Sequence, residues 1–205
     1  MERIKCDLQG EWEITDLSEP SKIIVIEITR DHKLIVISQC LYIDTILKRE
    51  GLDQANQVST PLNHNITLGP NPEGNMGDRS NSYAQLLGSL QFLANAMRPD
   101  IAYAVSRLAS YSTNPSLQHT TAIKRILWYL SGTRDYGIKY SNTPSGPNHF
   151  SGYTDAAYAN ADDCKSTTGY MYLAQRGAIT WRSKKQTITA LSSMEAEYVA
   201  LSEAA

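Results

Sequence analysis

The chain has 205 residues, of which 41% are hydrophobic and 20% are charged, and its formal net charge is -2. This composition is typical of a globular protein with one or two domains, and it excludes a wholly disordered chain or a wholly basic nucleic-acid binder. The apolar runs, such as residues 23–26, are far too short to cross a bilayer. Because the N-terminus also lacks the pattern of a secretory signal, we expect an intracellular protein that is neither secreted nor membrane-bound. Three widely spaced cysteines without a Cys-x-x-Cys pair predict neither a zinc site nor a disulfide framework.

The N-terminal part of the chain predicts a β-hairpin followed by a helix. Residues 23–28 and 34–37 are rich in β-branched side chains, and Asp31-His32-Lys33 between them is suited to a turn. Ser38 is expected to cap a helix in which apolar residues recur at helical spacing, and Gly51 is expected to end it.

Three amphipathic helices are predicted after a loop or linker at residues 54–82, which is rich in Asn, Pro and Gly. Pro99 should end the first helix and open the second, Asn114-Pro115 should begin the third, and Gly132 should follow its last turn. The residues expected on the apolar faces are Tyr83, Leu86, Leu87, Leu90, Leu93 and Met97, then Ile101, Val105 and Leu108, and finally Ala122, Ile123, Ile126, Leu127 and Leu130. We expect these helices to pack as a small bundle.

The last part of the chain predicts mainly strands. Residues 136–140 alternate as a strand, and the Pro- and Gly-rich stretch 141–148 is expected to be a domain boundary. Three further strands are predicted at 150–157, 168–174 and 178–183, with Gln175-Arg176-Gly177 as a tight turn between the last two. Ser192 or Ser193 is expected to cap a terminal helix whose first turn is reinforced by Glu195.

Two short stretches place carboxylates on these elements. Asp155 follows the start of a strand in Gly152-Tyr153-Thr154-Asp155, and Glu197 lies in the first turns of the terminal helix. A basic stretch free of acidic residues lies between them, from Cys164 to Met194. It could be a solvated basic face or a track for a phosphate backbone. The candidate nucleic-acid contacts are Lys124, Arg125, Lys165, Arg182, Lys184 and Lys185.

Several blocks, taken in order, resemble the C-terminal part of the Pol polyprotein of copia-type LTR retrotransposons. These blocks are YAQLLGSL at 83–90, RPDIAYAV at 98–105, KRILWYL at 124–130 with Gly132-Thr133, KSTTGY at 165–170, and WRSKKQ at 181–186 through EYVAL at 197–201. The resemblance covers nearly the whole chain and is weaker before about Gln39. In that family this region is the tail of the reverse transcriptase followed by ribonuclease H.

The resemblance implies an α+β fold with three parts. Residues 1–65 would be the tail of the polymerase palm, with the hairpin and one helix. Residues 66–142 would be a three-helix thumb or connection bundle. Residues 148–205 would be the truncated start of a ribonuclease H-like domain, with three strands and one helix. By the same resemblance, Asp155 and Glu197 match the first catalytic aspartate and the catalytic glutamate, both of them ligands of Mg²⁺, while Glu195 is interpreted as a helix-start charge.

The departures from the family pattern predict an incomplete enzyme. The polymerase motif Tyr-x-Asp-Asp has no counterpart, and the later ribonuclease H carboxylates would fall beyond Ala205. Two carboxylates cannot form the clamp that holds two metal ions, so we expect weak or absent Mg²⁺ binding and no cleavage of hybrids. The strand that carries Asp155 should have an open edge.

Three functional hypotheses remain open. The chain could be a catalytically incomplete piece of a retroelement polyprotein, a module that holds an RNA–DNA hybrid without cutting it, or a ribonuclease completed by further residues or by another chain. The expected partner is an RNA–DNA hybrid or another nucleic acid, and no membrane. The family implies a cytoplasmic particle and the nucleus as compartments, whereas the sequence predicts no particular oligomeric state.

Overall fold

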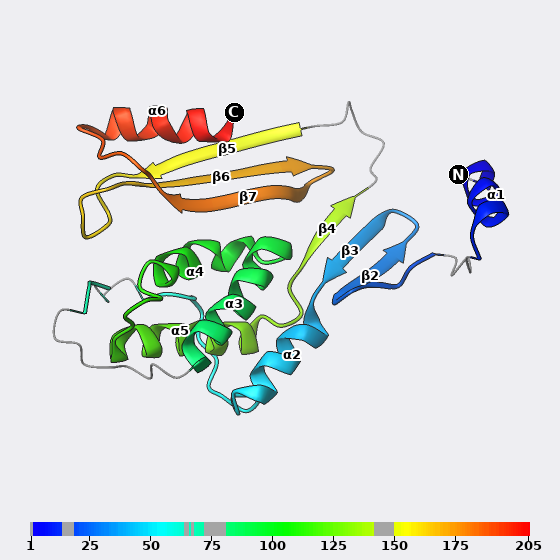
Figure 1. Ribbon diagram of the computed structural model, residues 1–205, viewed down its shortest axis with the longest axis horizontal. Helices are drawn as coiled ribbons and strands as arrows, with labels where there is room; N and C mark the ends of the chain where they lie inside the picture. Colours follow the sequence, from blue (N-terminus) through cyan, green and yellow to red (C-terminus); the bar gives the residue numbers. More distant parts are fainter. Residues whose placement is uncertain (1, 14–18, 64–65, 67, 72–80, 142–149) are drawn as a thin grey trace.

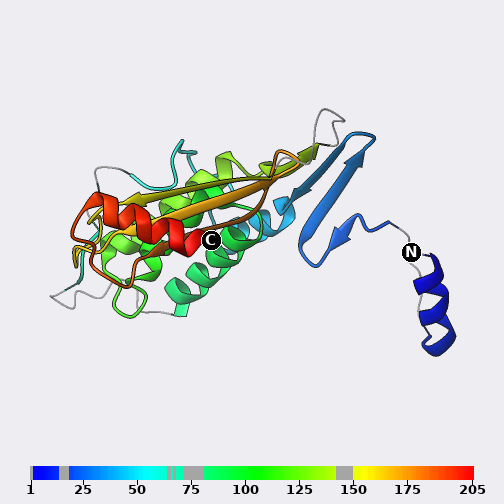
Figure 2. The same cartoon turned by 90° about the horizontal axis from the view of Figure 1, so that it is seen from above.

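The computed structural model describes residues 2–13, 19–63, 66, 68–71, 81–141 and 150–205. It is an α+β structure with two antiparallel sheets, one of them joined to a group of helices and the other covered by a single helix on one side (Figure 1). Helix α1 (Glu2–Glu11) stands apart from the other elements in both views (Figure 1 and Figure 2). Among the described residues, no helix is both long and apolar enough to span a membrane.

The first sheet confirms the predicted hairpin and adds two strands to it. Its order is β1-β2-β3-β4, and the strands are Lys22–Ile23, Ile26–Asp31, Leu34–Ser38 and Gly137–Ser141. The first hairpin strand begins at Ile26, later than expected, because the chain turns at Ile24, which has a φ of 57°. Strand β4 pairs with β3 from Leu34 opposite Ser141 to Ser38 opposite Gly137. This pairing joins the segment predicted as the palm tail to the end of the segment predicted as the helical bundle.

Helix α2 (Cys40–Arg49) begins later than predicted. Ser38 does not cap it, because this residue is the last one of β3 and pairs with Gly137, so Gln39 is the N-cap residue. The predicted end is confirmed, because Gly51 adopts the left-handed conformation, with a φ of 66°.

The helical core matches the predicted apolar faces. It is built from α3 (Asn81–Ala96), the short 3-10 helix η1 (Pro99–Ile101), α4 (Ala102–Ala109) and α5 (Leu117–Gly132). Every residue expected on those faces is buried, from Tyr83 to Leu130. All but Met97 join one hydrophobic cluster, which Ile43, Ile46 and Leu47 of α2 complete. Met97 packs instead in a second cluster with Ile138 and Ala178, between the two sheets.

Both predicted ends of α5 were wrong. The helix begins after Ser116, whose backbone N–H and hydroxyl each lie 2.8 Å from Nδ1 of the buried His119. Asn114 instead donates a hydrogen bond from its amide to the backbone oxygen of Asn71, at 3.0 Å, so this side chain holds a loop. Gly132 is the last helical residue, and Thr133 follows as the C-cap.

The second sheet confirms the three predicted strands. They are β5 (Phe150–Ala157), β6 (Thr167–Ala174) and β7 (Gly177–Lys185), in the order β5-β6-β7. Within the described residues β5 pairs only with β6, in line with the open edge expected for it. The expected boundary at 141–148 lies, except for Ser141 of β4, outside the described residues.

The turn between β6 and β7 differs in one detail from the prediction. Gln175 and Arg176, with φ values of 50° and 65°, form it alone, and Gly177 belongs to β7. A Cβ atom at Gly177 would lie 2.5 Å from the ring of Tyr140, so glycine is needed there for the close approach of β4 rather than for the turn.

The second sheet is covered on both faces. Helix α6 (Ser193–Ala204) packs on β5 and β6, and α4 lies on the other side (Figure 1). Trp181 of β7 donates a hydrogen bond from its indole to the backbone oxygen of Ala94 in α3, at 2.6 Å. The hydroxyl of Tyr140 donates to the backbone oxygen of Ala178, also at 2.6 Å. These contacts attach the second sheet to both the helices and the first sheet.

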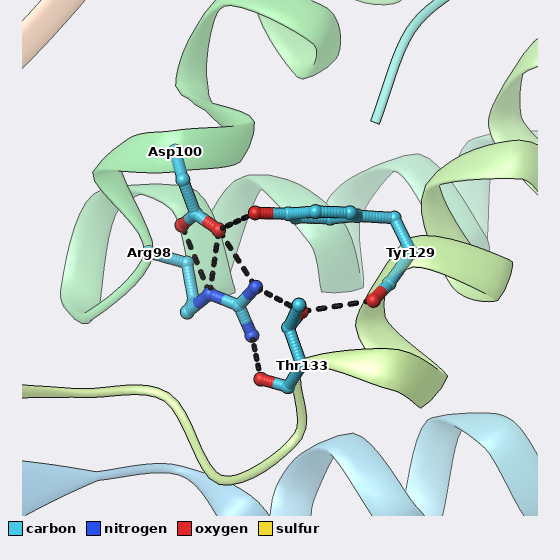
Figure 3. A network of polar contacts seen from close by, with 4 residues as sticks. All are labelled: Arg98, Asp100, Tyr129 and Thr133. Atoms are coloured by element: carbon cyan, nitrogen blue, oxygen red, sulfur yellow. Dashed lines mark hydrogen bonds and ion pairs between the residues drawn. The ribbon is translucent and has the colours of Figure 1, made fainter. Parts of the chain in front are cut away.

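A buried arginine joins the start of η1 to the end of α5 (Figure 3). The Arg98 side chain, 2% exposed, donates to both carboxylate oxygens of Asp100, at 2.9 and 2.7 Å, and to the backbone and side-chain oxygens of Thr133, at 2.9 and 2.6 Å. Tyr129 donates its hydroxyl hydrogen to the same carboxylate at 2.8 Å. Burial alone would raise the pKa of Asp100, but the hydrogen bonds and charge of Arg98 outweigh it and hold that pKa below its ordinary value.

Candidate functional site

Asp155 lies near the end of β5, and its side chain is exposed on the face of the sheet that looks toward α4. The direction follows from strand alternation. Trp181 and Met171 on that face contact the helical side of the molecule, and Tyr153 pairs with Met171 in the register of β5 and β6. Asp155 is two residues from Tyr153, so it shares this face. Its cross-strand partner is Gly169 in the central strand.

A cleft of about 330 Å³ lies between this face and the start of α4. Its helical wall contains Pro99, Ala102 and Tyr103. Its other wall includes Tyr153, Thr154, Asp155, Ala157, Thr167, Gly169, Tyr170, Met171, Trp181, Arg182 and Ser183. The lining is mainly apolar and aromatic, with Asp155 as its carboxylate and Arg182 as its cation, which is the usual character of a ligand pocket.

Glu197 lies in α6, which packs on the opposite face of the sheet. Two contacts with α6 identify that face. The hydroxyl of Tyr172 donates a hydrogen bond to the backbone oxygen of Ala204. The side-chain amide of Gln186 donates to the hydroxyl of Thr168 at 3.1 Å and to the backbone oxygen of Ala196 at 2.9 Å. The end of β5 and the start of α6 lie at the same end of the sheet (Figure 1). The two predicted catalytic carboxylates thus come from neighbouring elements, but the structure does not bring them together on one face.

Glu195, the competing carboxylate, is used by the start of α6. The hydroxyl of Ser192 accepts a hydrogen bond from the backbone N–H of Glu195 at 3.2 Å, and the Glu195 carboxylate accepts one from the backbone N–H of Leu191 at 2.7 Å. Of the two predicted cap residues, Ser192 is the N-cap. The predicted serine cap and the reinforcement by Glu195 are confirmed, although the Glu195 carboxylate bonds the residue before the N-cap and not the N-cap itself. Glu195 and Glu197 are both exposed.

The described residues do not supply the carboxylate cluster of a catalytic site for two metal ions. No group of three or more His, Cys, Asp or Glu side chains in this part of the chain is arranged to hold a metal ion. Magnesium is usually held by one or two carboxylates together with water and substrate phosphates, but catalytic pairs of ions require several carboxylates that converge on them. Asp155 and Glu197 on opposite faces do not supply such a set, so no step of a metal-dependent reaction follows from these residues.

Most of the candidate cations already have partners. Lys185 and Lys165 both reach Asp163, at 2.9 and 3.9 Å, and Lys184 reaches Glu203 at 3.7 Å. The hydrogen bond from Lys185 and its charge lower the pKa of Asp163. The basic stretch that appeared free of acidic residues is thus met by two carboxylates from outside it. Because these ion pairs are partly exposed, they are weak. Arg182 is exposed and lies on the same face of β7 as Lys184.

The two candidate cations of α5 differ. The guanidinium of Arg125 donates to the backbone oxygen and the hydroxyl of Thr60, at 3.2 and 2.9 Å, so this residue fastens the loop that precedes α3. Lys124, by contrast, is exposed.

Sequence reasoning overlooked the cleft residues Tyr103, Tyr153 and Gly169. The signal that could have found Gly169 is a glycine in the interior of a predicted strand, which often marks a close approach by a ligand or another backbone.

Comparison with known proteins identifies the class. The chain is 36% identical over 211 residues to the retrovirus-related Pol polyprotein from transposon TNT 1-94 of Nicotiana tabacum, a match that covers 98% of this chain and 16% of that protein. It is 37% identical over 195 residues to the corresponding polyprotein from transposon RE1 of Arabidopsis thaliana, covering 94% of this chain and 13% of the relative. These matches define a protein related to the Pol polyproteins of transposons.

Within that class, the chain belongs to the family of copia-type retrotransposon Pol polyproteins. It spans less than a fifth of the length of the two polyproteins compared. A shorter relative, named secreted RxLR effector protein 161 of Plasmopara viticola, is 42% identical over 123 residues, which are 60% of this chain and 85% of that protein. No protein-family model matches the chain, and no solved structure matches it either.

Proposed function

We propose that this chain is the segment of a copia-type Pol polyprotein in which the tail of the reverse transcriptase passes into a ribonuclease H-like unit, and that by itself it holds an RNA–DNA hybrid without cleaving it. One observation carries the proposal. A three-stranded antiparallel sheet is followed by a helix, with Asp155 near the end of the first strand and Glu197 in the first turns of the helix. This is the order in which the resemblance places the first two ribonuclease H carboxylates.

The separation of the carboxylates supports the absence of cleavage. Hydrolysis by two metal ions needs ligands that stabilise both the attacking and the leaving oxygen of the phosphodiester. Asp155 faces the cleft beside α4, whereas α6 with Glu197 lies across the sheet, and the described residues contain no acidic cluster. We therefore expect no detectable cleavage of a labelled RNA–DNA hybrid with Mg²⁺. Cleavage that disappears in Asp155→Asn would contradict this proposal.

The cations on and near β7 support binding. In the described part of the chain, Lys165, Arg182, Lys184 and Lys185 form ion pairs with Asp163 and Glu203 alone, so two positive charges remain. Alternation along β7 puts Arg182 and Lys184 on one face of the strand. A phosphate group can also displace the weak surface pairs. Since each neutralised phosphate lowers the slope of log K against log salt by about 0.9, two of them predict a slope of about -2 for a hybrid duplex.

The binding test compares two sets of alanine variants in fluorescence anisotropy titrations at several salt concentrations. The double variant Arg182→Ala/Lys184→Ala should weaken hybrid binding at every sequence and make the slope shallower by about 1–2. Lys48→Ala, which removes an exposed lysine from α2, is the matched control and should leave the slope unchanged. No binding by the unmodified chain at low salt, or the same loss in the control, would refute the binding function.

A further inference from the structure

The floor of the cleft has an unusual residue at its centre. Gly169 lies in the middle strand of the second sheet, between Asp155 on β5 and Ser183 on β7. Glycine in a strand interior is unfavourable, because it costs conformational entropy and packs no side chain. A Cβ atom at Gly169 would meet nothing within 4 Å, whereas at Gly152 and Gly177 it would meet tyrosine rings at 2.5 Å. Packing inside this molecule therefore explains those two glycines and leaves Gly169 unexplained.

The surroundings of Gly169 suit a flat ring. Tyr103, 42% exposed, lines the helical wall, and Tyr153, 63% exposed, stands beside the glycine on the sheet. Aromatic side chains of this kind are the usual platforms for unpaired nucleic-acid bases. The volume of about 330 Å³ lies at the lower end of the range for ligand pockets, so it suits one base better than a duplex.

The carboxylate specifies which base. We propose that the cleft binds an unpaired guanine, lying over Gly169 with its Watson–Crick edge toward Asp155. An ionised carboxylate only accepts hydrogen bonds, and it can accept two side by side. Guanine offers two adjacent donors on that edge, the ring N1–H and the 2-amino group. Adenine and cytosine place an acceptor beside their donor, and uracil flanks its single donor with two carbonyl groups, so each of them would set an acceptor against the carboxylate.

This inference goes beyond the proposed function, because it requires neither a metal ion nor a duplex. The test is isothermal titration of the full chain with guanosine monophosphate in buffer containing EDTA. Inosine monophosphate is the matched ligand, since it differs from guanosine monophosphate only by the missing 2-amino group. Losing one hydrogen bond to a charged acceptor should weaken binding by about tenfold or more. Adenosine monophosphate should bind more weakly still.

Two substitutions test the place of binding. Gly169→Val puts a β-branched side chain into open space in a strand, so it should preserve or raise the melting temperature while abolishing the binding of guanosine monophosphate. Thr180→Val is the matched control, because Thr180 is exposed on β7 and pairs with Tyr172 on the face that α6 covers. It should bind as the unmodified chain does. Asp155→Asn should lower the affinity by about tenfold, because it replaces an acceptor by a donor. If Gly169→Val does not fold, Tyr103→Ala takes its place and should weaken binding.

Each outcome supports or overturns the guanine site in the cleft. Hybrid binding, the proposed function, is judged by its own titration. No heat of binding with guanosine monophosphate at millimolar concentration overturns the inference. Equal affinity for inosine monophosphate does the same, and so does undiminished binding by folded Gly169→Val or, in its place, by Tyr103→Ala. A chain that binds hybrids with the expected salt slope and ignores guanosine monophosphate retains the proposed function and loses only this site. The reverse result keeps the site and removes the hybrid-binding function.

Discussion

The helical region and the second sheet differ in what they bury. In α2–α5 most of the completely buried side chains are long and aliphatic, such as Leu90, Leu93, Leu108 and Leu127, each with 0% exposure. In the second sheet and α6 they are small or polar, such as Ala196, Ala200, Thr168 and Gln186, with 0 to 1% exposure. Large apolar residues of α6 and of the segment just before it point outward instead. Leu191, Met194, Tyr198 and Leu201 are 55 to 87% exposed.

This difference indicates two modes of stabilisation. Complete burial of a leucine contributes about 1.5–3 kcal/mol, and an alanine buries far less apolar surface. The second sheet therefore depends on strand pairing, on polar contacts such as the bridge made by Gln186, and on attachment to α3 through Trp181. We therefore expect the helical region to be stabilised mainly by its own core, and α6 to be the element that opens first.

The same truncation in the two regions should give the largest contrast. Leu127→Ala leaves a cavity among fully buried residues and should lower the free energy of unfolding by about 3 kcal/mol. Leu201→Ala removes a side chain that is 55% exposed and should change it by less than about 0.5 kcal/mol. Urea unfolding followed by circular dichroism measures both values. Equal losses would mean that the outer face of α6 is covered in solution, and the comparison would fail.

The next effect concerns the buried arginine of the helical region. Arg98→Leu leaves the carboxylate of Asp100 and the backbone oxygen of Thr133 without their main donor, so stability should fall by about 2 kcal/mol at pH 7. Arg134→Leu is the control, because its ion pair with Asp44 spans 3.5 Å at the surface and is 47% exposed on the arginine side. The control should change stability by less than about 0.5 kcal/mol.

The loss caused by Arg98→Leu should also depend on pH. In the folded protein the pKa of Asp100 lies below its ordinary value of 3.8, so its contribution is present above that value and is lost as pH falls through the folded pKa. Without Arg98, burial remains and raises the pKa of Asp100, so protonation stabilises the variant. Because the pKa of Asp100 in the variant lies above 3.8, the stability gap between the two proteins should begin to narrow above pH 3.8 and should narrow further as pH falls through the lowered pKa of the unmodified protein. A constant gap from pH 7 to pH 3 would show that Arg98 acts through packing alone.

Local patterns predicted the elements and the helical core but not the ends set by distant pairing. Apolar spacing in residues 83–130 identified the buried residues, because a helix turns its face to the core with a fixed period. The start of α2 was missed because Ser38 is drawn into β3 by pairing with Gly137, about a hundred residues away. Likewise, the basic stretch did not indicate its ion pairs, because only the fold brings Lys185 back to Asp163 and Glu203 to Lys184.

The candidate site was predictable only in part. The resemblance identified Asp155 and Glu197, and alternation along β5 determines that Asp155 lies on the same face as Tyr153. The face of the sheet that α6 covers depends on tertiary contacts, such as the hydrogen bond between Tyr172 and Ala204, which the local sequence does not predict. The cleft was unpredictable for the same reason. Tyr103 and Gly169 are 66 positions apart in sequence and meet only because α4 packs against the second sheet.

The smallest expected effect tests how α6 is held. Ser192→Ala removes the hydroxyl that accepts the backbone N–H of Glu195 at 3.2 Å, and loss of such a cap costs about 1 kcal/mol. Ser193→Ala is the matched control one residue later, where serine is inside the helix, and it should cost nothing or stabilise slightly. Because α6 makes mainly alanine contacts with its sheet, the loss in Ser192→Ala should appear first as faster hydrogen exchange in residues 196–204, before global unfolding changes.

Exchange rates in α3 and α5 should remain the same. If those helices exchanged faster to the same extent as α6, the two regions would form one cooperative unit, and the difference in their cores would not divide their stability.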